Sequence, residues 1–571
     1  MSAHIHSIYR CYLHRVGVGL AALLVSAAAS AAPTLIDHVN GYTLDSAGKL
    51  QRFEAMLIKN GKVVATGTSA DLASADMEER AKNATVIDGK GRTLLPGLID
   101  AHGHVMGLGA MKLQADVTGT GSVDDALSRV KQFAQAHPDS AWITGRGWNQ
   151  VIWNLGRFPT AKELDKAVAD RPVWLSRVDG HAGWANSVAM QRAGIDKTTP
   201  DPSGGRIERD AEGNPNGVFV DGAMDLITSK IPPPTTLQAS AALDASLAEM
   251  ARVGLTGVGD AGIDADTYRL YRRYADQGTL TARIYAMIGG VGDDFDTISK
   301  DGPLIGYGND FLTVRSVKLY ADGALGSRGA AMLAPYSDDP KNSGLLFDAP
   351  ALMTAKIGKA LSRNYQVAVH AIGDAANHEV LDGFEAAYKL HGGEQLRNRV
   401  EHAQIVSLKD IPRFVPLKLI ASMQPTHATS DMNMAEDRVG HERIAGAYAW
   451  RTFLKQGTVV AFGSDFPVES PNPFFGLHAA VTRQDHDGHP PGGWYPEQAL
   501  NLTEALRAFT LDAAYAEHAE KTLGTLEPGK WADFIFVDRD IFAVKPSQLW
   551  STVVEETWVG GKRVFAKSAS K

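Results

Sequence analysis

The chain has 571 residues, of which 44% are hydrophobic and 21% are charged. This composition is close to that of ordinary globular proteins and excludes general disorder, while the length suits one large domain with additions. The net charge of −8 at pH 7 gives no electrostatic support for a nucleic-acid partner.

Residues 1–32 have the features of a secretory signal peptide. Arg10 and Arg15 precede an apolar run over residues 16–29, and small residues up to Pro33 offer a cleavage site. The run is shorter than the ~20 residues of a spanning helix, which favours a cleaved signal over a signal anchor. We expect a periplasmic or secreted protein, without stable membrane insertion once the signal is removed.

The only cysteine of the chain, Cys11, lies inside this segment, so the mature chain would contain none. Disulfides, thiolate zinc sites and cysteine nucleophiles are therefore excluded for the mature protein. Any metal would have to be bound by nitrogen and oxygen ligands.

The segment after the signal, residues 33–95, is predicted to form short strands. A hairpin is expected over Ala55–Val64, because Asn60-Gly61 is a favoured two-residue turn. Residues Thr85–Leu95 are expected to form a second strand pair through a Gly-Lys-Gly turn.

Residues 525–571 at the other end have the same character. A strand is predicted over Ala532–Asp538 and a hairpin over Glu556–Phe565. We interpret residues 33–95 and 525–571 together as one composite β-sandwich domain. Two unrelated caps are the alternative.

Residues 96–524 alternate short apolar segments with helical stretches, which is typical of parallel β/α architecture. A (β/α)₈ TIM barrel, of the α/β class, accounts for eight such segments. An insertion over residues 106–234, rich in Trp and Gly, is expected to form a cap beside the barrel mouth. The eight predicted strands are Gly97–Ala101, Thr256–Gly259, Arg283–Ile288, Ser316–Tyr320, Val367–Val369, Arg399–Glu401, Leu419–Met423 and Val459–Phe462.

Residues that can bind metals accompany several of these strands. His102 and His104 are two apart after the first strand, so both imidazoles can project the same way. Catalytic residues of such barrels come from the carboxyl ends of strands, and each histidine alone could equally be a core or loop residue. A shared metal site is indicated because the later strands contain, or run into, Lys318, His370, His402 and Asp465.

Longer motifs surround these residues. They are LLPGLIDAHGH from Leu94, RVDGHAGWANS from Arg177, VKLYADGALGSRGA from Val317, VAVHAIGDAA from Val367, VEHAQ from Val400, SMQPTH from Ser422, FGSDFPV from Phe462 and LEPGKWADFIFVD from Leu526. Together they resemble the amidohydrolase superfamily over nearly the whole mature chain. The resemblance is to its amidohydrolase family 3 branch, which includes N-substituted formamide deformylase-like enzymes.

The resemblance implies a binuclear metal centre in which Lys318 is carboxylated and bridges two ions. An ammonium has no lone pair, but a buried lysine beside cations has a lowered pKa and its neutral amine can take up carbon dioxide. An ion pair of Lys318 with a nearby acid such as Asp322 is the alternative. The ligands suit two Zn²⁺ ions, with Mn²⁺, Fe²⁺ or Co²⁺ as other choices. The implied ligands are His102, His104, Lys318, His370, His402 and Asp465.

The implied function is hydrolysis of a C–N bond of amide or formamide type in a small molecule. A metal-activated hydroxide would attack the carbonyl, and Asp465 would accept the proton of the water and deliver it to the departing nitrogen. Two alternatives are an esterase or lactonase on the same site and a non-catalytic binding or regulatory barrel. The oligomeric state is left open, a homo-oligomer included.

Five further residues are candidates for contact with substrate: Trp148, His181, Arg328, Gln424 and His427. Plain structural roles are the alternatives. These are packing of the insertion for the tryptophans at 148, 153 and 184, stabilisation of the insertion for His181, and a solvated loop position for Arg328.

Overall fold

A computed structural model describes residues 32–568, apart from 75–76, 78–80, 151, 178–179, 181 and 203–204. The predicted signal peptide, except for Ala32, and the candidate His181 lie outside the described residues. Among the helices that are described, none combines the length and apolar character needed to cross a bilayer.

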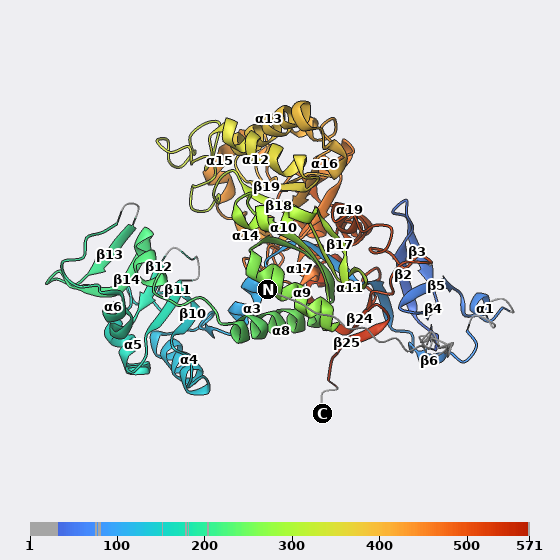
Figure 1. The fold of residues 1–571 in the computed structure, drawn as a ribbon, viewed down its shortest axis with the longest axis horizontal. Coiled ribbons are helices and arrows are strands. Elements are labelled where there is room, and N and C mark those ends of the chain that lie inside the picture. Colours follow the sequence, from blue (N-terminus) through green and yellow to red (C-terminus); the bar gives the residue numbers. More distant parts are fainter. Residues whose placement is uncertain are drawn as a thin grey trace, which may run out of the picture.

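Parallel strands form a barrel at the centre of the molecule, which confirms the predicted TIM-barrel class (Figure 1). Each of the eight predicted segments overlaps one strand, and β17 (Leu304–Gly306) adds a short antiparallel partner to β18 (Leu312–Tyr320). The order around the sheet is β22 (Val460–Phe462), β21 (Ile420–Met423), β20 (Arg399–His402), β19 (Gln366–Ala371), β18 (Leu312–Tyr320), β16 (Arg283–Gly289), β15 (Leu255–Ile263) and β8 (Leu98–Gly103).

The first and last barrel strands are held together by a buried carboxylate. Asp100 of β8 accepts hydrogen bonds from the backbone N–H of Ser464, at 3.0 Å, and from its hydroxyl, at 2.6 Å. A Cβ on the preceding Gly463 would lie 2.6 Å from both Asp100 Oδ1 and the backbone nitrogen of His102, so this approach requires glycine.

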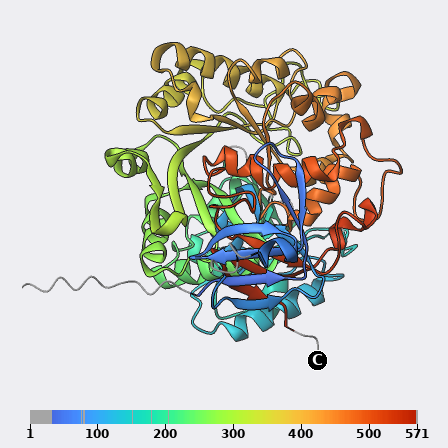
Figure 2. The same cartoon turned by 90° about the vertical axis from the view of Figure 1, so that its right-hand side faces the viewer.

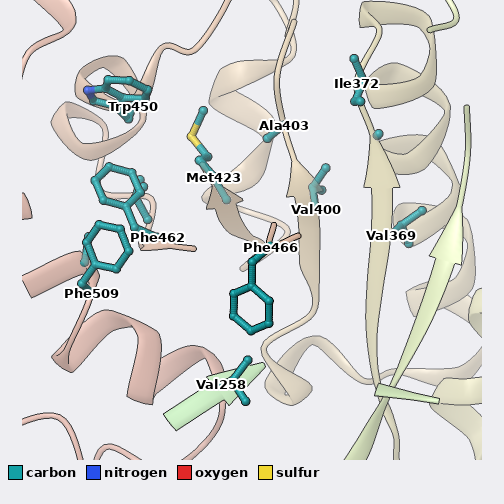
Figure 3. Packing of buried hydrophobic residues seen from close by; sticks show 14 of the residues in the cluster. Val258, Val369, Ile372, Val400, Ala403, Met423, Trp450, Phe462, Phe466 and Phe509 are labelled. Atoms are coloured by element: carbon teal, nitrogen blue, oxygen red, sulfur yellow. The ribbon is translucent and has the colours of Figure 1, made fainter. Parts of the chain in front are cut away.

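Alternating residues of the strands point to the barrel interior and to the outer helices. Val369 and Val400 belong to the outer hydrophobic core, where Trp450, Phe462 and Phe509 also pack (Figure 3). The outer helices are α8 (Thr236–Arg252), α9 (Ala265–Gln277), α10 (Asp293–Ile298), α11 (Tyr307–Asp310), α12 (Pro350–Ser362), α13 (Asp374–His391), α14 (Pro425–Asp431), α15 (Ala435–Arg443), α16 (Trp450–Lys455), α17 (Pro473–Thr482), α18 (Leu502–Ala508) and α19 (Leu511–Ala516).

Two further sheets form a β-sandwich from both ends of the chain, as predicted; it faces the viewer in Figure 2. Their shared core includes Met56, Leu94, Phe534 and Trp558. One sheet has the order β5 (Lys62–Gly67), β4 (Ala55–Lys59), β1 (Thr34–Asp37) and β6 (Thr85–Asp88), with helix α1 (Ser69–Leu72) following β5. The other has the order β25 (Lys562–Ala566), β24 (Val554–Val559), β23 (Phe534–Val537), β7 (Thr93–Pro96), β2 (Asn40–Leu44) and β3 (Leu50–Phe53).

The hairpin at Asn60-Gly61 is confirmed, and both turn residues have positive φ, at 53° and 76°. The prediction that Thr85–Leu95 forms a strand pair is wrong. β6 pairs with β1, whereas β7 pairs with β2 and β23, because the turn between them passes from one sheet to the other.

The insertion forms its own lobe beside the barrel, at the left of Figure 1. Helix α3 (Val105–Lys112) joins it to the barrel by packing on α8, and a Cβ on Gly109 would lie 1.8 Å from the carbonyl oxygen of Ala242. Its sheet has the order β13 (Gly205–Arg209), β14 (Pro215–Asp221), β12 (Ala182–Ala185), β11 (Val173–Arg177), β10 (Ile143–Trp148) and β9 (Ala115–Asp116). The helices of the segment are α3 (Val105–Lys112), α4 (Val123–Ala136), α5 (Ala161–Ala167), α6 (Ser187–Ala193) and α7 (Asp225–Thr228).

Candidate metal centre

The carboxylate of Asp465, which follows β22, lies next to His102 at the end of β8 and His104 just after it. Its Oδ1 lies 3.0 Å from Nε2 of His104 and 3.5 Å from Nε2 of His102. Nζ of Lys318, on β18, lies 3.0 Å from the same nitrogen of His102. Ligand atoms of the two histidines and the aspartate all lie within 4.8 Å of one another, close enough for one ion to contact all three.

His370 and His402 complete the cluster from β19 and β20. Their ring centroids are 4.5 Å apart, and the ring of His402 lies 4.9 Å from that of His102. Nε2 of His370 is buried and has no hydrogen-bond partner among the described residues. The structure therefore brings together all six residues that the sequence predicts as ligands.

His427, at the start of α14, was predicted to bind substrate, and it lies directly against the cluster of proposed ligands. Its ring stacks on His402 at 6.0 Å, and its Nε2 lies 3.8 Å from Oδ2 of Asp465. This nitrogen is buried without a partner in the described chain. His402, His427 and Asp465 form a second group whose ligand atoms lie within 4.8 Å, so the position fits either a substrate contact or a ligand.

The ionisation of these groups fits a divalent cation. Burial, assisted by the charge of Lys318, lowers the pKa of His102 to about 4 and that of His370 to about 3. Burial also lowers the pKa of His402. Burial would raise the pKa of Asp465, but the hydrogen bond from His104 and the nearby imidazoles hold it well below its usual range. Neutral imidazoles and an ionised carboxylate are the ligand forms that zinc and its neighbours bind.

Lys318 is buried inside the barrel with only 1% of its surface exposed. Burial lowers its pKa to about 8, although Glu401 and Asp465 oppose the shift. The alternative ion pair with Asp322 is not what the structure shows. The Asp322 carboxylate instead accepts hydrogen bonds of 2.8–3.0 Å from the backbone N–H groups of Ala331, Ile372 and Gly373.

Two of the clustered residues have backbone conformations that favour glycine. φ is 70° at His402 and 59° at Asp465. Non-glycine residues in this left-handed region carry strain, and such strain concentrates at functional sites, where surrounding contacts hold it. The strand ends are therefore bent to aim these side chains at the common centre.

Buried polar residues behind the cluster were not identified from the sequence. Glu401 accepts hydrogen bonds from Nδ1 of His102 and from Arg399. Asp260 accepts from the backbone N–H of Val105, beside His104, at 2.8 Å. Each is an acidic residue within a buried strand, where a charge needs a partner. An acidic residue inside an apolar segment is the sequence feature that could have identified them.

Gln424, predicted to bind substrate, is buried and places its Oε1 2.8 Å from Nδ1 of His402. Arg328, another predicted contact, forms a two-point ion pair with Asp338 at 2.9 and 3.1 Å. The guanidinium thus joins two parts of the loop after β18.

Trp148 requires a correction, because it is a core residue of the insertion and no part of it is exposed. Its ring packs 6.5 Å from Trp153 and 6.2 Å from Trp184, and its Nε1 donates to the carbonyl of Leu175 at 2.7 Å. The tryptophans therefore pack within the insertion, which was the alternative role given for them.

Comparison with known proteins agrees with this geometry. The sequence model of the amidohydrolase family matches residues 85–565. The putative amidohydrolase YtcJ of Bacillus subtilis is 32% identical over 542 residues, which cover 92% of this chain and 98% of the relative. N-substituted formamide deformylase of Arthrobacter pascens is 27% identical over 94% of this chain and 99% of its own length.

A solved structure shares the architecture. The crystal structure of an uncharacterized metal-dependent hydrolase from Pyrococcus horikoshii OT3 has a TM-score of 0.76 and 28% identity, and the match covers 90% of this chain and 99% of that one. The family match, the relatives and the clustered ligands lead to one conclusion. The chain belongs to the amidohydrolase family, in its family 3 branch, and is a metal-dependent hydrolase of that type.

Proposed function

We propose that this protein hydrolyses the C–N bond of a small amide or formamide. The observation that carries the proposal is the position of the Asp465 carboxylate, 3.0 Å from His104 and 3.5 Å from His102 at the barrel mouth. The similarity to a deformylase of N-substituted formamides supports the choice of bond.

The proposed centre holds two divalent ions, with zinc as the first choice. Ions bound there would lower the pKa of a coordinated water towards ~7 and polarise the carbonyl of the substrate. The ligands would be His102, His104, Lys318 as its carbamate, His370, His402 and Asp465. The lowered pKa of Lys318 supports the carbamate, because only the neutral amine adds carbon dioxide.

Asp465 is the proposed acid and base. It is ionised, and it lies beside the histidines, where it can take a proton from the attacking water. The oxygen of that water adds to the carbonyl carbon, the C–N bond breaks, and Asp465 returns the proton to the departing nitrogen. The products are a carboxylic acid and an amine. His427 is placed to donate a hydrogen bond from Nε2 to the carbonyl oxygen of the substrate.

We also propose that the protein acts outside the cytoplasm, after removal of residues 1–32. The arginines, apolar run and small residues of that segment support export. The N-terminal sequence of protein recovered from the periplasm or culture medium tests this. A start near Pro33 is expected, and an intact Met1 start would contradict cleavage.

The test of function combines metal analysis with matched substrates. Purified protein is analysed for bound metals, stripped with chelator, reloaded with zinc, manganese or cobalt, and assayed on amides, formamides and esters that share the same substituents. We expect bound metal and turnover of an amide or formamide. Turnover of esters alone would indicate an esterase, and protein with neither metal nor turnover would indicate a binding barrel.

A further inference from the structure

We propose that Glu401 is a positioning residue of the metal centre. It accepts the Nδ1–H of His102 and so makes this imidazole present the lone pair of Nε2 to the ion. The proposal rests on His102 being a metal ligand, as proposed above. Glu401 itself touches neither substrate nor the reacting atoms.

The two nitrogens of His102 face different partners. Nδ1 contacts Oε2 of Glu401, and both side chains are wholly buried. Nε2 faces Nζ of Lys318 at 3.0 Å and the carboxylate of Asp465 at 3.5 Å. A hydrogen bond from one ring nitrogen to a carboxylate fixes the tautomer, fixes the ring orientation and makes the other nitrogen a stronger ligand.

Arg399 holds the Glu401 carboxylate in place. Both residues lie on β20, two apart and therefore on the same face. Nε of Arg399 donates to Oε1 at 2.6 Å, and Nη2 donates to Oε2 at 2.9 Å.

The same guanidinium also fixes the backbone next to His102. Nη2 of Arg399 donates to the carbonyl oxygen of Ala101 at 2.8 Å and also to the hydroxyl oxygen of Ser422 at 2.8 Å. One group therefore ties β8, β20 and β21 together around the ligand. Buried ion pairs seldom stabilise a fold more than apolar residues of the same volume, so alignment of His102 is the better reason for this pair.

The other histidines of the cluster have weaker or different contacts. Nε2 of His370 lies 3.5 Å from Oδ1 of Asp322 and forms no hydrogen bond with the described residues. Nδ1 of His402 meets the neutral amide of Gln424 at 2.8 Å. His104 pairs through Nε2 with Asp465, itself a proposed ligand. We therefore expect His102 to depend on its acceptor more than the other histidines do.

The test removes the acceptor without leaving a buried charge unpaired. Two double variants are compared, and both carry Arg399→Met. The first adds Glu401→Gln, which keeps an acceptor oxygen, and the second adds Glu401→Met, which has none. Zinc affinity is measured by competition with a chelator. Loss of such supporting partners weakens metal binding by about 10- to 100-fold. We expect that loss in the methionine variant and a smaller one in the glutamine variant.

Two controls separate this effect from general destabilisation. Asp533→Asn breaks another buried pair, in which Asp533 accepts from Nε of Arg283 at 2.6 Å at the start of β16. It should lower the melting temperature and leave zinc affinity unchanged. His102→Ala should abolish binding at this position.

The outcomes distinguish this inference from the proposed function. Wild-type zinc affinity in the methionine variant, with loss of zinc in His102→Ala, would overturn the role of Glu401 and leave the metal centre standing. Equal binding by wild type and His102→Ala would remove the ligand assignment as well. If the double variants do not fold, ¹⁵N spectra of zinc-loaded wild-type protein decide, since the proposal requires the proton of His102 on Nδ1 and is overturned by a proton on Nε2.

Discussion

The backbone N–H of Asp465 donates a hydrogen bond to the carbonyl oxygen of His102 over 2.7 Å. The first and last strands of the barrel are thus joined at two residues that also carry side chains of the proposed centre. Because the bond runs between main-chain atoms, either side chain can be replaced without losing it. Stability and catalysis can therefore be tested separately at this position.

Asp465→Asn should keep the fold and lose most of the activity. An amide cannot accept the proton of the attacking water, and general acid–base groups contribute about 10²- to 10⁴-fold to rates. We expect kcat to fall by a factor in that range, with circular dichroism and melting temperature close to wild type. A kcat near normal on the best substrate of the panel would rule out Asp465 as the base.

Lys318→Ala should lose metal, because the variant has no amine to form a carbamate. Metal per chain, measured on the purified protein, should fall, and short carboxylic acids should restore part of the activity by supplying the missing oxygens. Lys530→Ala is a matched control, since Lys530 is another largely buried lysine and lies in the β-sandwich. Full metal content in Lys318→Ala without added acid would contradict a bridging role.

His427→Gln separates the two roles that fit its position. As a donor to the substrate, its loss should lower kcat by about 10²- to 10³-fold, as for other donors to a developing oxyanion, with the metal content unchanged. A fall in metal per chain would identify it as a ligand instead. His441→Gln, at a histidine whose side chain is 88% exposed, should change neither quantity.

Glu517 should make stability depend on pH. The residue is buried, its Oε1 has no partner among the described residues, and burial raises its pKa to about 8, against the opposing charge of Arg399. From its ordinary pKa of 4.5 up to about 8, the unfolded chain has released this proton and the folded chain keeps it. The free energy of unfolding therefore falls as pH rises through that range and levels off above it.

Glu517→Gln should remove this contribution. The difference in free energy of unfolding between the variant and wild type should be more favourable to the variant at pH 8 than at pH 5. It is measured by denaturant unfolding of metal-free protein at both pH values. Glu520→Gln, at a neighbouring carboxylate paired with Arg397, should not reproduce the gain. Parallel changes with pH in wild type and Glu517→Gln would show that the carboxyl ionises normally in the folded state.

The barrel strands and the ligands were accessible from the sequence because each depends on a short local pattern. Apolar segments such as Val367–Val369 are bounded by polar residues, and His370 then follows at the carboxyl end. The strand with which each strand pairs was harder to predict. The strands within Thr85–Leu95 are real, but they pair with different sheets, which only contacts distant in sequence decide.

The supporting residues were missed for a related reason. Within VEHAQ, Glu401 could face solvent or the barrel interior, and only the assembled sheet shows that it faces His102. Trp148 has the converse ambiguity. A large aromatic residue at the end of a strand is equally compatible with a pocket wall and a core, and the packing against Trp153 and Trp184 decides for the core.

The sandwich that joins the two ends of the chain has a consequence for biosynthesis. Asn40 donates to the carboxylate of Asp540 at 2.9 Å, although 500 residues separate them in the sequence. The edge of β7 that pairs with β23 therefore has no strand partner while the ribosome synthesises the barrel between them, at about 5–20 residues per second. A product that stops short of β23 cannot complete this sheet, so nascent chains would need protection from aggregation until synthesis is nearly finished.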